Sequence, residues 1–216
     1  RERVEYKLEA PDLGQFFHAA LKLFGERVNS KNLTWGQLSN EECKALSSEV
    51  VDLLAPRLQS EILLSSARRR YLTGKLRRIV ERATQTLCEH SRRGQFQPVG
   101  LELSFGPDGT IPAATFTLQD GSEMILAGRI DRIDAVERDG VIYLRVIDYK
   151  SGRVTIDLSD IYHSLKLQLL AYLDVAMTYA KNLLGQDVMP GAILYFCIND
   201  PMIKTKGEVP AEEEIE

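Results

Sequence analysis

Apolar residues in the first half of the chain recur at the three- and four-residue spacing of amphipathic helices. This spacing predicts a helix over residues 12–28. The capping-box sequence SNEE begins a second predicted helix over residues 39–54, which Pro56 is expected to end. A third predicted helix is long and basic and covers residues 65–92, with Gly94 just beyond its last turn.

The apolar spacing changes to two after Gly94, as expected for β-strands. The runs PVGLELSF, AATFTLQ, MILAGRIDRIDAV and VIYLRVIDYK are rich in β-forming residues and are separated by the turn signals GPDG, DG and RDG. This pattern predicts an antiparallel meander. A fourth helix is predicted over residues 159–184, and the apolar run GAILYFCI then predicts a last strand that is buried in the sheet.

The order of these elements predicts an α/β or α+β sandwich in a single domain. The length of 216 residues suits one domain with a full hydrophobic core. The domain divides into a mainly helical part over residues 1–95, a sheet with a helix over residues 96–205, and an acidic tail over residues 206–216.

The composition is that of an ordinary globular protein, with 44% hydrophobic and 27% charged residues, and it excludes a disordered or collagen-like chain. Because the chain has no apolar run of about 18 residues and no signal-peptide character at its start, we expect a soluble, cytoplasmic protein with no membrane association. Cys43, Cys88 and Cys197 lie far apart in the sequence, which predicts reduced, buried thiols.

Basic residues are concentrated in the third predicted helix, although the net charge of the chain is −4. Nine lysines and arginines lie between residues 68 and 93, against two glutamates. Such a stripe is typical of a solvated helix face and, less often, of a track for a polyanion. The pattern alone leaves both interpretations open.

The hairpin GRIDRIDAVERDGVIYLRVIDYKSG carries charged residues at the end of an apolar strand face. If Asp139 and Gly140 form a two-residue turn, the register places Asp131 directly opposite Asp148. Two like charges beside an apolar patch repel each other, so the pair predicts a bound cation, and oxygen ligands favour Mg²⁺. Lys150 lies farther along the same face.

A divalent cation, two carboxylates and a lysine suit the hydrolysis of a phosphodiester, because the cation activates a water and the lysine stabilises the developing charge. The alternative is a plain salt bridge, in which Asp131 or Asp148 pairs with Lys150 or Arg129. The phosphate-binding pattern GxxxxGK is not present, which argues against nucleotide hydrolysis within this chain.

The motifs GRIDRID, VIDYKSG and LQLLAYLDVA resemble the RecB-type branch of the PD-(D/E)XK nucleases. The segments APDLGQFFHAALKLF and PVGLELSFG are similar to the C-terminal nuclease domain of the AddB family of helicase/nuclease subunits. The resemblance implies a restriction-endonuclease-like α/β fold, in which helices flank a central mixed sheet with an antiparallel meander. It also implies a metal-dependent deoxyribonuclease that uses Mg²⁺ or Mn²⁺.

The same resemblance assigns roles to individual residues. It implies that the metal ligands are His18, Asp131, Asp148 and the carbonyl of Tyr149, that Lys150 is catalytic, and that Gln168, Tyr172 and Glu102 complete the catalytic set. Gln168 and Tyr172 form a Q-x-x-x-Y motif, whose spacing places both on one helix face.

Four of these residue assignments have an alternative explanation. His18 lies on an apolar helix and is also explained as a core histidine. Gln168 is also explained as a cap or bridge, and Tyr172 as a core residue. Because Glu102 alternates with two leucines, its side chain is also explained as facing solvent.

The resemblance implies a wider setting for the domain. The partners would be DNA, most simply single-stranded, and an AddA-like helicase subunit that feeds a strand to the nuclease during repair of double-strand breaks by recombination. AddB-like proteins hold a 4Fe–4S cluster on four cysteines, and none of the three cysteines here has that placement. We therefore expect a fragment of a larger subunit. A different hypothesis is a nuclease fold that serves as an inactive scaffold and binds DNA or a subunit.

Overall fold

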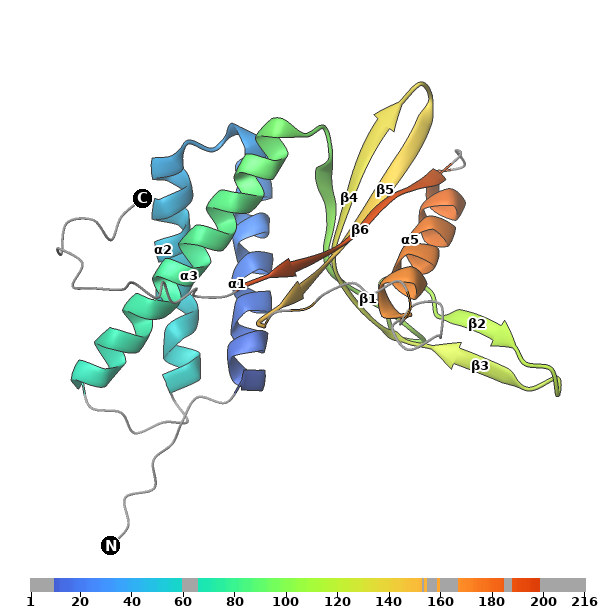
Figure 1. Cartoon of the computed structure of the whole chain (residues 1–216), viewed down its shortest axis with the longest axis horizontal. Coiled ribbons are helices and arrows are strands. Elements are labelled where there is room, and N and C mark those ends of the chain that lie inside the picture. Colours follow the sequence, from blue (N-terminus) through green and yellow to red (C-terminus); the bar gives the residue numbers. More distant parts are fainter. Residues whose placement is uncertain are drawn as a thin grey trace, which may run out of the picture.

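A four-stranded sheet lies between a layer of three helices and a single helix in the computed structural model (Figure 1). The structure describes residues 10–59, 66–152, 154, 159, 167–184 and 188–198. The helical layer consists of α1 (Ala10–Ser30), α2 (Asn40–Gln59) and α3 (Ser66–Arg93), with the short 3-10 helix η1 (Trp35–Gln37) between the first two. No helix among the described residues is both long and apolar enough to cross a membrane.

The central sheet is mixed. Its strands are β1 (Gln97–Phe105), β4 (Gly128–Arg138), β5 (Val141–Lys150) and β6 (Val188–Cys197), in the order β1-β4-β5-β6. The first three are antiparallel, whereas β6 runs parallel to β5 and is preceded in the chain by α5 (Gln168–Leu184). The prediction of an α/β fold with a mixed sheet and flanking helices is confirmed.

The β4–β5 hairpin has the predicted turn. Asp139 and Gly140 have φ angles of 55° and 77°, the left-handed values that a tight two-residue turn requires. Arg138 accordingly pairs with Val141, and the same register continues to the pair of Arg132 and Ile147.

The predicted run MILAGRIDRIDAV is not one strand. Its first part is β3 (Glu123–Leu126), which pairs with β2 (Ala114–Thr117) in a separate two-stranded ribbon that projects from the body (Figure 1). Only the part from Gly128 joins the central sheet. The reason is that β1 ends at Phe105, opposite Gly128, so the residues before Gly128 have no strand of the central sheet to pair with.

The helix boundaries agree with the prediction except at Pro56, which lies inside α2 and does not end it. Ser39 and Glu42 form the predicted capping box through reciprocal side-chain to backbone hydrogen bonds. A proline removes one backbone hydrogen bond, but the helix runs only three residues beyond Pro56, and the buried Leu54 and Ala55 hold this turn on the core. The described part of the fourth predicted helix is α5, and residues 160–166 lie outside the described residues.

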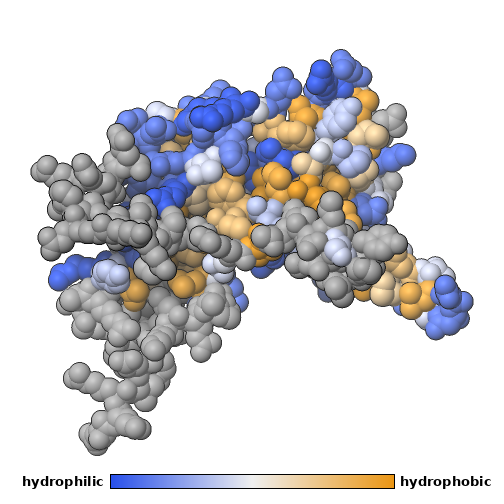
Figure 2. All heavy atoms as spheres, in the orientation of Figure 1, coloured by the Kyte–Doolittle hydropathy of each residue, from blue (hydrophilic) through white to orange (hydrophobic). Residues whose placement is uncertain are grey.

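The prediction that the last strand is buried within the sheet was wrong, because β6 is an edge strand in the described part of the chain. Met189 is 49% exposed and Leu194 is 37% exposed. Figure 2 shows apolar residues at the surface in the middle of the view, where β6 lies in Figure 1. The parallel strand after α5 adds to the outside of β5, so it pairs along only one of its edges in the described residues.

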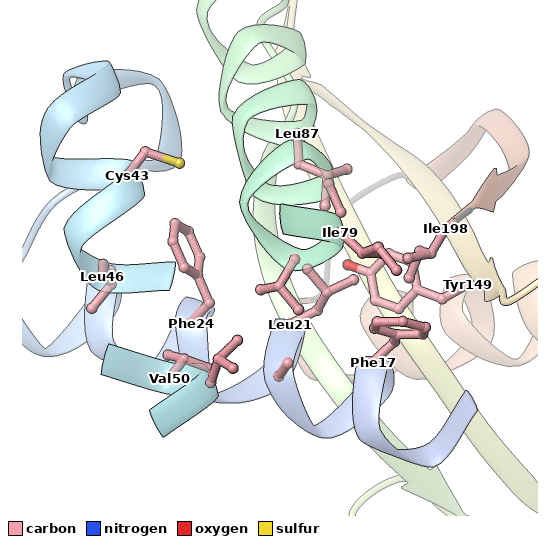
Figure 3. Packing of buried hydrophobic residues seen from close by; sticks show 14 of the residues in the cluster. Phe17, Leu21, Phe24, Cys43, Leu46, Val50, Ile79, Leu87, Tyr149 and Ile198 are labelled. Carbon is pink, nitrogen blue, oxygen red and sulfur yellow. The ribbon is translucent and has the colours of Figure 1, made fainter. Parts of the chain in front are cut away.

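Two apolar clusters lie on opposite faces of the sheet. On the helical-layer side, residues of all three helices pack against Tyr149 of β5 and against Ile198 (Figure 3). The labelled members from the helices are Phe17, Leu21, Phe24, Cys43, Leu46, Val50, Ile79 and Leu87. On the other side, α5 covers Ile133, Leu144 and Val146. The sheet is thus fixed between two layers.

A buried ion network joins β4 and β5 on the helical-layer side. Arg132 is only 1% exposed, and its Nε donates a hydrogen bond of 2.6 Å to Oδ1 of Asp134. Arg145 donates to the other oxygen of the same carboxylate. The guanidinium of Arg132 also lies 4.5 Å from the ring centre of Trp35, which connects the network to η1.

The network predicts a large loss of stability when Asp134 loses its charge. In Asp134→Asn two arginines, one fully buried, lack their counterion, and we expect the free energy of unfolding to fall by about 3 kcal/mol or more. Urea titration followed by circular dichroism measures this change. Asp139→Asn at the exposed hairpin turn is the matched control, and an equal effect in both variants would refute the role of the network.

Candidate active site

Three side chains from three elements converge beside the sheet. His18 of α1 has its Nδ1 atom 2.9 Å from Oε1 of Glu102 on β1 and 3.3 Å from Oδ1 of Asp131 on β4. One nitrogen and two carboxylate oxygens of this cluster lie within 4.8 Å of one another, and the three side chains have the donor types that hold a metal ion. His18 therefore takes part in a polar cluster, which removes its explanation as a core histidine.

Glu102 reaches this cluster because its backbone departs from regular β-structure. Its φ angle is 50°, a left-handed value that is strained for a residue with a side chain. The neighbouring pairs Leu101 with Arg132 and Leu103 with Ile130 place Glu102 opposite Asp131. Its side chain is only 5% exposed, so the alternative that it faces solvent is wrong.

Asp131 is held by the backbone of β5 as well as by His18. The amide of Tyr149 donates a hydrogen bond of 2.6 Å to Oδ2 of Asp131. The backbone pairing of β4 with β5 ends one step earlier, at Arg132 and Ile147, so the predicted facing of Asp131 and Asp148 lies just beyond the last pair. The Tyr149 ring is buried and contacts the His18 ring edge-on, at 5.8 Å between ring centres.

Asp148 and Lys150 form an ion pair next to this cluster. Oδ2 of the buried Asp148 is 2.6 Å from Nζ of Lys150, and Nζ also lies 5.7 Å from the ring centre of Tyr195 on β6. Asp148 is not among the three groups that lie within 4.8 Å of one another. The salt-bridge alternative thus describes Asp148 and Lys150 as they stand, whereas Asp131 is bound by His18 and Tyr149.

Gln168 and Tyr172 face each other on α5, as their spacing predicts. The amide of Gln168 donates a hydrogen bond of 2.8 Å to the hydroxyl of Tyr172. The Tyr172 ring packs edge-on against Phe105, and its hydroxyl lies 3.6 Å from the position that a Cβ at Gly128 would take. This pair therefore borders the start of β4, and no described contact joins it to His18 or Asp131.

Comparison with known protein families identifies the superfamily of this chain. The sequence matches the model of the PD-(D/E)XK nuclease superfamily over residues 1–216. The chain belongs to the PD-(D/E)XK nuclease superfamily. An acidic residue, any residue and a lysine, the pattern in this name, occur at Asp148, Tyr149 and Lys150 at the end of β5.

Similar curated proteins are named as subunits of an ATP-dependent helicase/deoxyribonuclease. That of Pelotomaculum thermopropionicum is 66% identical over 216 residues, which are 100% of this chain and 19% of that protein. Those of Desulforamulus reducens and Geobacillus thermodenitrificans are 54% and 47% identical, over 99% and 100% of this chain and 18% of each protein. This PD-(D/E)XK chain thus spans about a fifth of the length of the curated relatives it matches, and the resemblance seen in its motifs is confirmed.

Arg129 contacts a different carboxylate from the two that the salt-bridge alternative named. Nε of Arg129 lies 2.8 Å from Oε2 of Glu102, whereas the sequence suggested Asp131 or Asp148 as its partner. The sequence did contain a signal that Arg129 lies near the site, because Arg129 is two residues before Asp131 on a strand and such residues share a face. What the sequence did not reveal is that Glu102 turns inward to meet it.

The charges of the site shift the pKa values of its members. Hydrogen bonds with Asp131 and then Glu102 raise the pKa of His18 from 6.5 to about 10. Burial raises the pKa of Asp148, an effect that Lys150 opposes and the charge of Asp131 reinforces. Burial alone would lower the pKa of Lys150, but its hydrogen bond with Asp148 and the nearby carboxylate charges raise it overall. His18 and Lys150 are therefore cationic near neutral pH in the metal-free protein.

The raised pKa of His18 predicts a pH-dependent contribution to stability. Since the folded value lies above the unfolded value of 6.5, the stabilisation is fully present below pH 6.5 and is lost as the pH rises through about 10. In EDTA we expect His18→Gln to cost about 2 kcal/mol at pH 7 and much less at pH 10. Urea titrations of both proteins across this range measure the difference.

His90→Gln is the control for the same titrations. The pKa of His90 is lowered by burial and by neighbouring arginines, so this side chain is neutral from pH 7 to 10 in both the folded and unfolded states. A cost of His18→Gln that stays constant over that range would show that the imidazole is not held protonated by the two carboxylates.

Proposed function

We propose that this PD-(D/E)XK domain is a metal-dependent deoxyribonuclease that hydrolyses phosphodiester bonds of a DNA strand. The observation that supports the proposal best is the convergence of His18, Glu102 and Asp131 beside the ion pair of Asp148 and Lys150. A donor set dominated by carboxylate oxygens suits a hard divalent cation, and we propose Mg²⁺ or Mn²⁺.

The ligands in this proposal are His18, Asp131, Asp148 and the carbonyl of Tyr149, with Glu102 added because its oxygen lies in the cluster. When bound, a divalent cation polarises a phosphate oxygen and lowers the pKa of a bound water. The Tyr149 amide fixes the orientation of Asp131 through its hydrogen bond to Oδ2. His18 must lose its proton to act as a ligand, so the two carboxylates that hold this proton would change partner.

Lys150 acts in this proposal as an electrostatic catalyst. Its raised pKa keeps the ammonium group charged at neutral pH, so it can donate hydrogen bonds to a phosphate or to the attacking water but is a poor proton acceptor. Asp148 and the Tyr195 ring hold the ammonium in place. We propose that the hydrogen-bonded pair of Gln168 and Tyr172 supports the reaction by positioning the strand near the start of β4.

The proposed setting is supported by the relatives, which are named as ATP-dependent helicase/deoxyribonuclease subunits. We propose that the strand is single-stranded DNA fed by an AddA-like helicase partner during double-strand-break repair by recombination. In the longer protein we propose a 4Fe–4S cluster on cysteines outside these 216 residues. Cys43 and Cys88 lie buried together in the helical layer, whereas Cys197 on β6 is only partly buried, so the prediction of a buried thiol was wrong for Cys197.

The nuclease proposal predicts metal-dependent cleavage that requires the end of β5. With labelled single-stranded DNA and Mg²⁺ or Mn²⁺, we expect Asp148→Ala and Lys150→Ala each to reduce the cleavage rate about 100-fold or more. Asp139→Asn at the hairpin turn should retain the parent rate, and EDTA should abolish cleavage. Gel electrophoresis of the labelled strand measures all of these rates.

The same assay separates the nuclease from the scaffold hypothesis. It is run on this chain and on the longer protein that contains it. If neither protein cuts with either cation, yet both bind DNA, the nuclease proposal is wrong and the domain is a scaffold.

The third helix offers a path for the strand. Several of its basic side chains are already paired, because Arg77 contacts Asp52 and both Arg92 and Arg93 contact Glu89. Arg70, Arg78 and Arg82 are exposed, and their side chains have no partner in the described part of the chain. The side chains of residues 66–69 are not among those that the structure describes. We propose that these three arginines contact phosphates of the bound strand.

This path predicts a change in the salt dependence of DNA binding. Replacing Arg70, Arg78 and Arg82 by Gln removes three phosphate contacts, and we expect the slope of log K against log salt to become shallower by about 2. Fluorescence anisotropy at several KCl concentrations measures the slope. Arg93→Gln on the same helix, whose guanidinium is paired with Glu89, is the control and should change it much less. An unchanged slope in the triple variant would remove α3 from the DNA path.

A further inference from the structure

We propose that Arg129 leaves Glu102 when a divalent cation binds in the cluster, and that its guanidinium then binds a phosphate of the DNA strand. The inference rests on the proposed function, because it takes the cation and the DNA as ligands of this site. It assigns to Arg129 a role in substrate binding that depends on the cation.

The ion pair between Arg129 and Glu102 is asymmetric in its exposure. Nε of Arg129 is 2.8 Å from Oε2 of Glu102, yet the arginine side chain is 60% exposed while that of the glutamate is 5% exposed. Glu102 is the one partner of Arg129 in the described part of the chain. The guanidinium therefore loses little when it leaves, because water replaces the contact. Glu102, being buried, needs a cation beside it at all times.

The charge balance of the site explains why a divalent cation would displace Arg129. Three carboxylates, Glu102, Asp131 and Asp148, are paired with the side chains of His18, Arg129 and Lys150. A cation bound to Glu102 and Asp131 adds two positive charges beside the guanidinium and competes with it for the same glutamate. Repulsion and competition both weaken the ion pair of Arg129 and Glu102.

The other two cations are less suited to meet the substrate first. Nζ of Lys150 is held by the buried Asp148 and lies over the Tyr195 ring, and His18 lies between two carboxylates. Arg129 is the most exposed of the three, so it lies on the solvent side, from which a strand approaches. Its planar guanidinium donates paired hydrogen bonds to phosphate oxygens, which a lysine ammonium does not match.

Binding of a labelled single-stranded oligonucleotide to this chain, in EDTA and in Ca²⁺, tests the proposal, with a gel to confirm that the strand stays intact. In EDTA, Arg129→Gln should bind within about twofold of the parent, because Arg129 is then occupied by Glu102. In Ca²⁺ the variant should bind about tenfold more weakly than the parent, as expected for one lost charge-assisted contact. Arg129→Lys should fall between them, because it keeps the charge without the paired donors.

Arg138→Gln is the matched control, since Arg138 is exposed at the far end of the same strand and should leave both affinities unchanged. A second readout is the binding of Mn²⁺ alone, followed by electron paramagnetic resonance. Arg129→Gln should bind Mn²⁺ more tightly than the parent, because the competing guanidinium is gone.

Three results would overturn the proposal: an equal loss of DNA affinity in EDTA and Ca²⁺, no loss in Ca²⁺, or weaker Mn²⁺ binding by Arg129→Gln. The last would show that Arg129 orients Glu102 for the cation. Failure of the proposed function looks different, because the parent itself would then bind no Mn²⁺ and gain no DNA affinity from Ca²⁺. Thermal unfolding of each variant confirms that the fold is retained.

Discussion

Mutual repulsion among three little-exposed carboxylates is the constraint on which the site depends. Glu102, Asp131 and Asp148 lie where β1, β4 and β5 approach α1, and in such partly dehydrated surroundings like charges interact strongly. The molecule offsets this repulsion with cations from different elements, which include His18 of α1 and Lys150 of β5. The contact that α1 makes with the sheet through His18 is therefore part of the charge balance of the site.

The backbone around the site is shaped by the same requirement. Glu102 adopts a strained left-handed conformation in the middle of a strand, and regular pairing of Leu101 and Leu103 with β4 on either side holds it there. On the neighbouring strand, the Tyr149 amide binds the carboxylate of Asp131 beyond the last backbone pair of the hairpin. The regular backbone geometry of β1 is thus interrupted at Glu102, and the pairing of β4 with β5 ends next to Asp131.

The ionic network around Asp134 on β4 differs from the site, because its role is structural. Asp134 binds Arg132 and Arg145, and Arg132 is covered by the ring of Trp35. All of these partners are enclosed, so the network holds the sheet against the helical layer and has little access to a ligand. In the site, by contrast, one of the two basic side chains that contact Glu102 is Arg129, which reaches solvent. Exposure of one partner is what makes an ion pair exchangeable.

The sequence by itself determined the local features, because they depend on residues close together in the chain. Helical spacing located α1 and α3, the capping box located the start of α2, and the Asp139–Gly140 turn determined the register of the hairpin. Five short motifs spread along the chain, among them the one with Asp148 and Lys150, supported the resemblance to the PD-(D/E)XK superfamily.

Only the tertiary structure decided which of these residues meet. The split of one predicted strand into β3 and β4 and the edge position of β6 depend on where neighbouring strands end, which no local pattern records. His18 and Glu102 are 84 residues apart in the chain, and their contact requires an inward turn of the Glu102 backbone that strand alternation does not predict. The same turn gave Arg129 its partner. Torsion angles imposed by packing, and contacts between distant segments, are properties of the assembled fold, and for this reason they could not be predicted from the sequence.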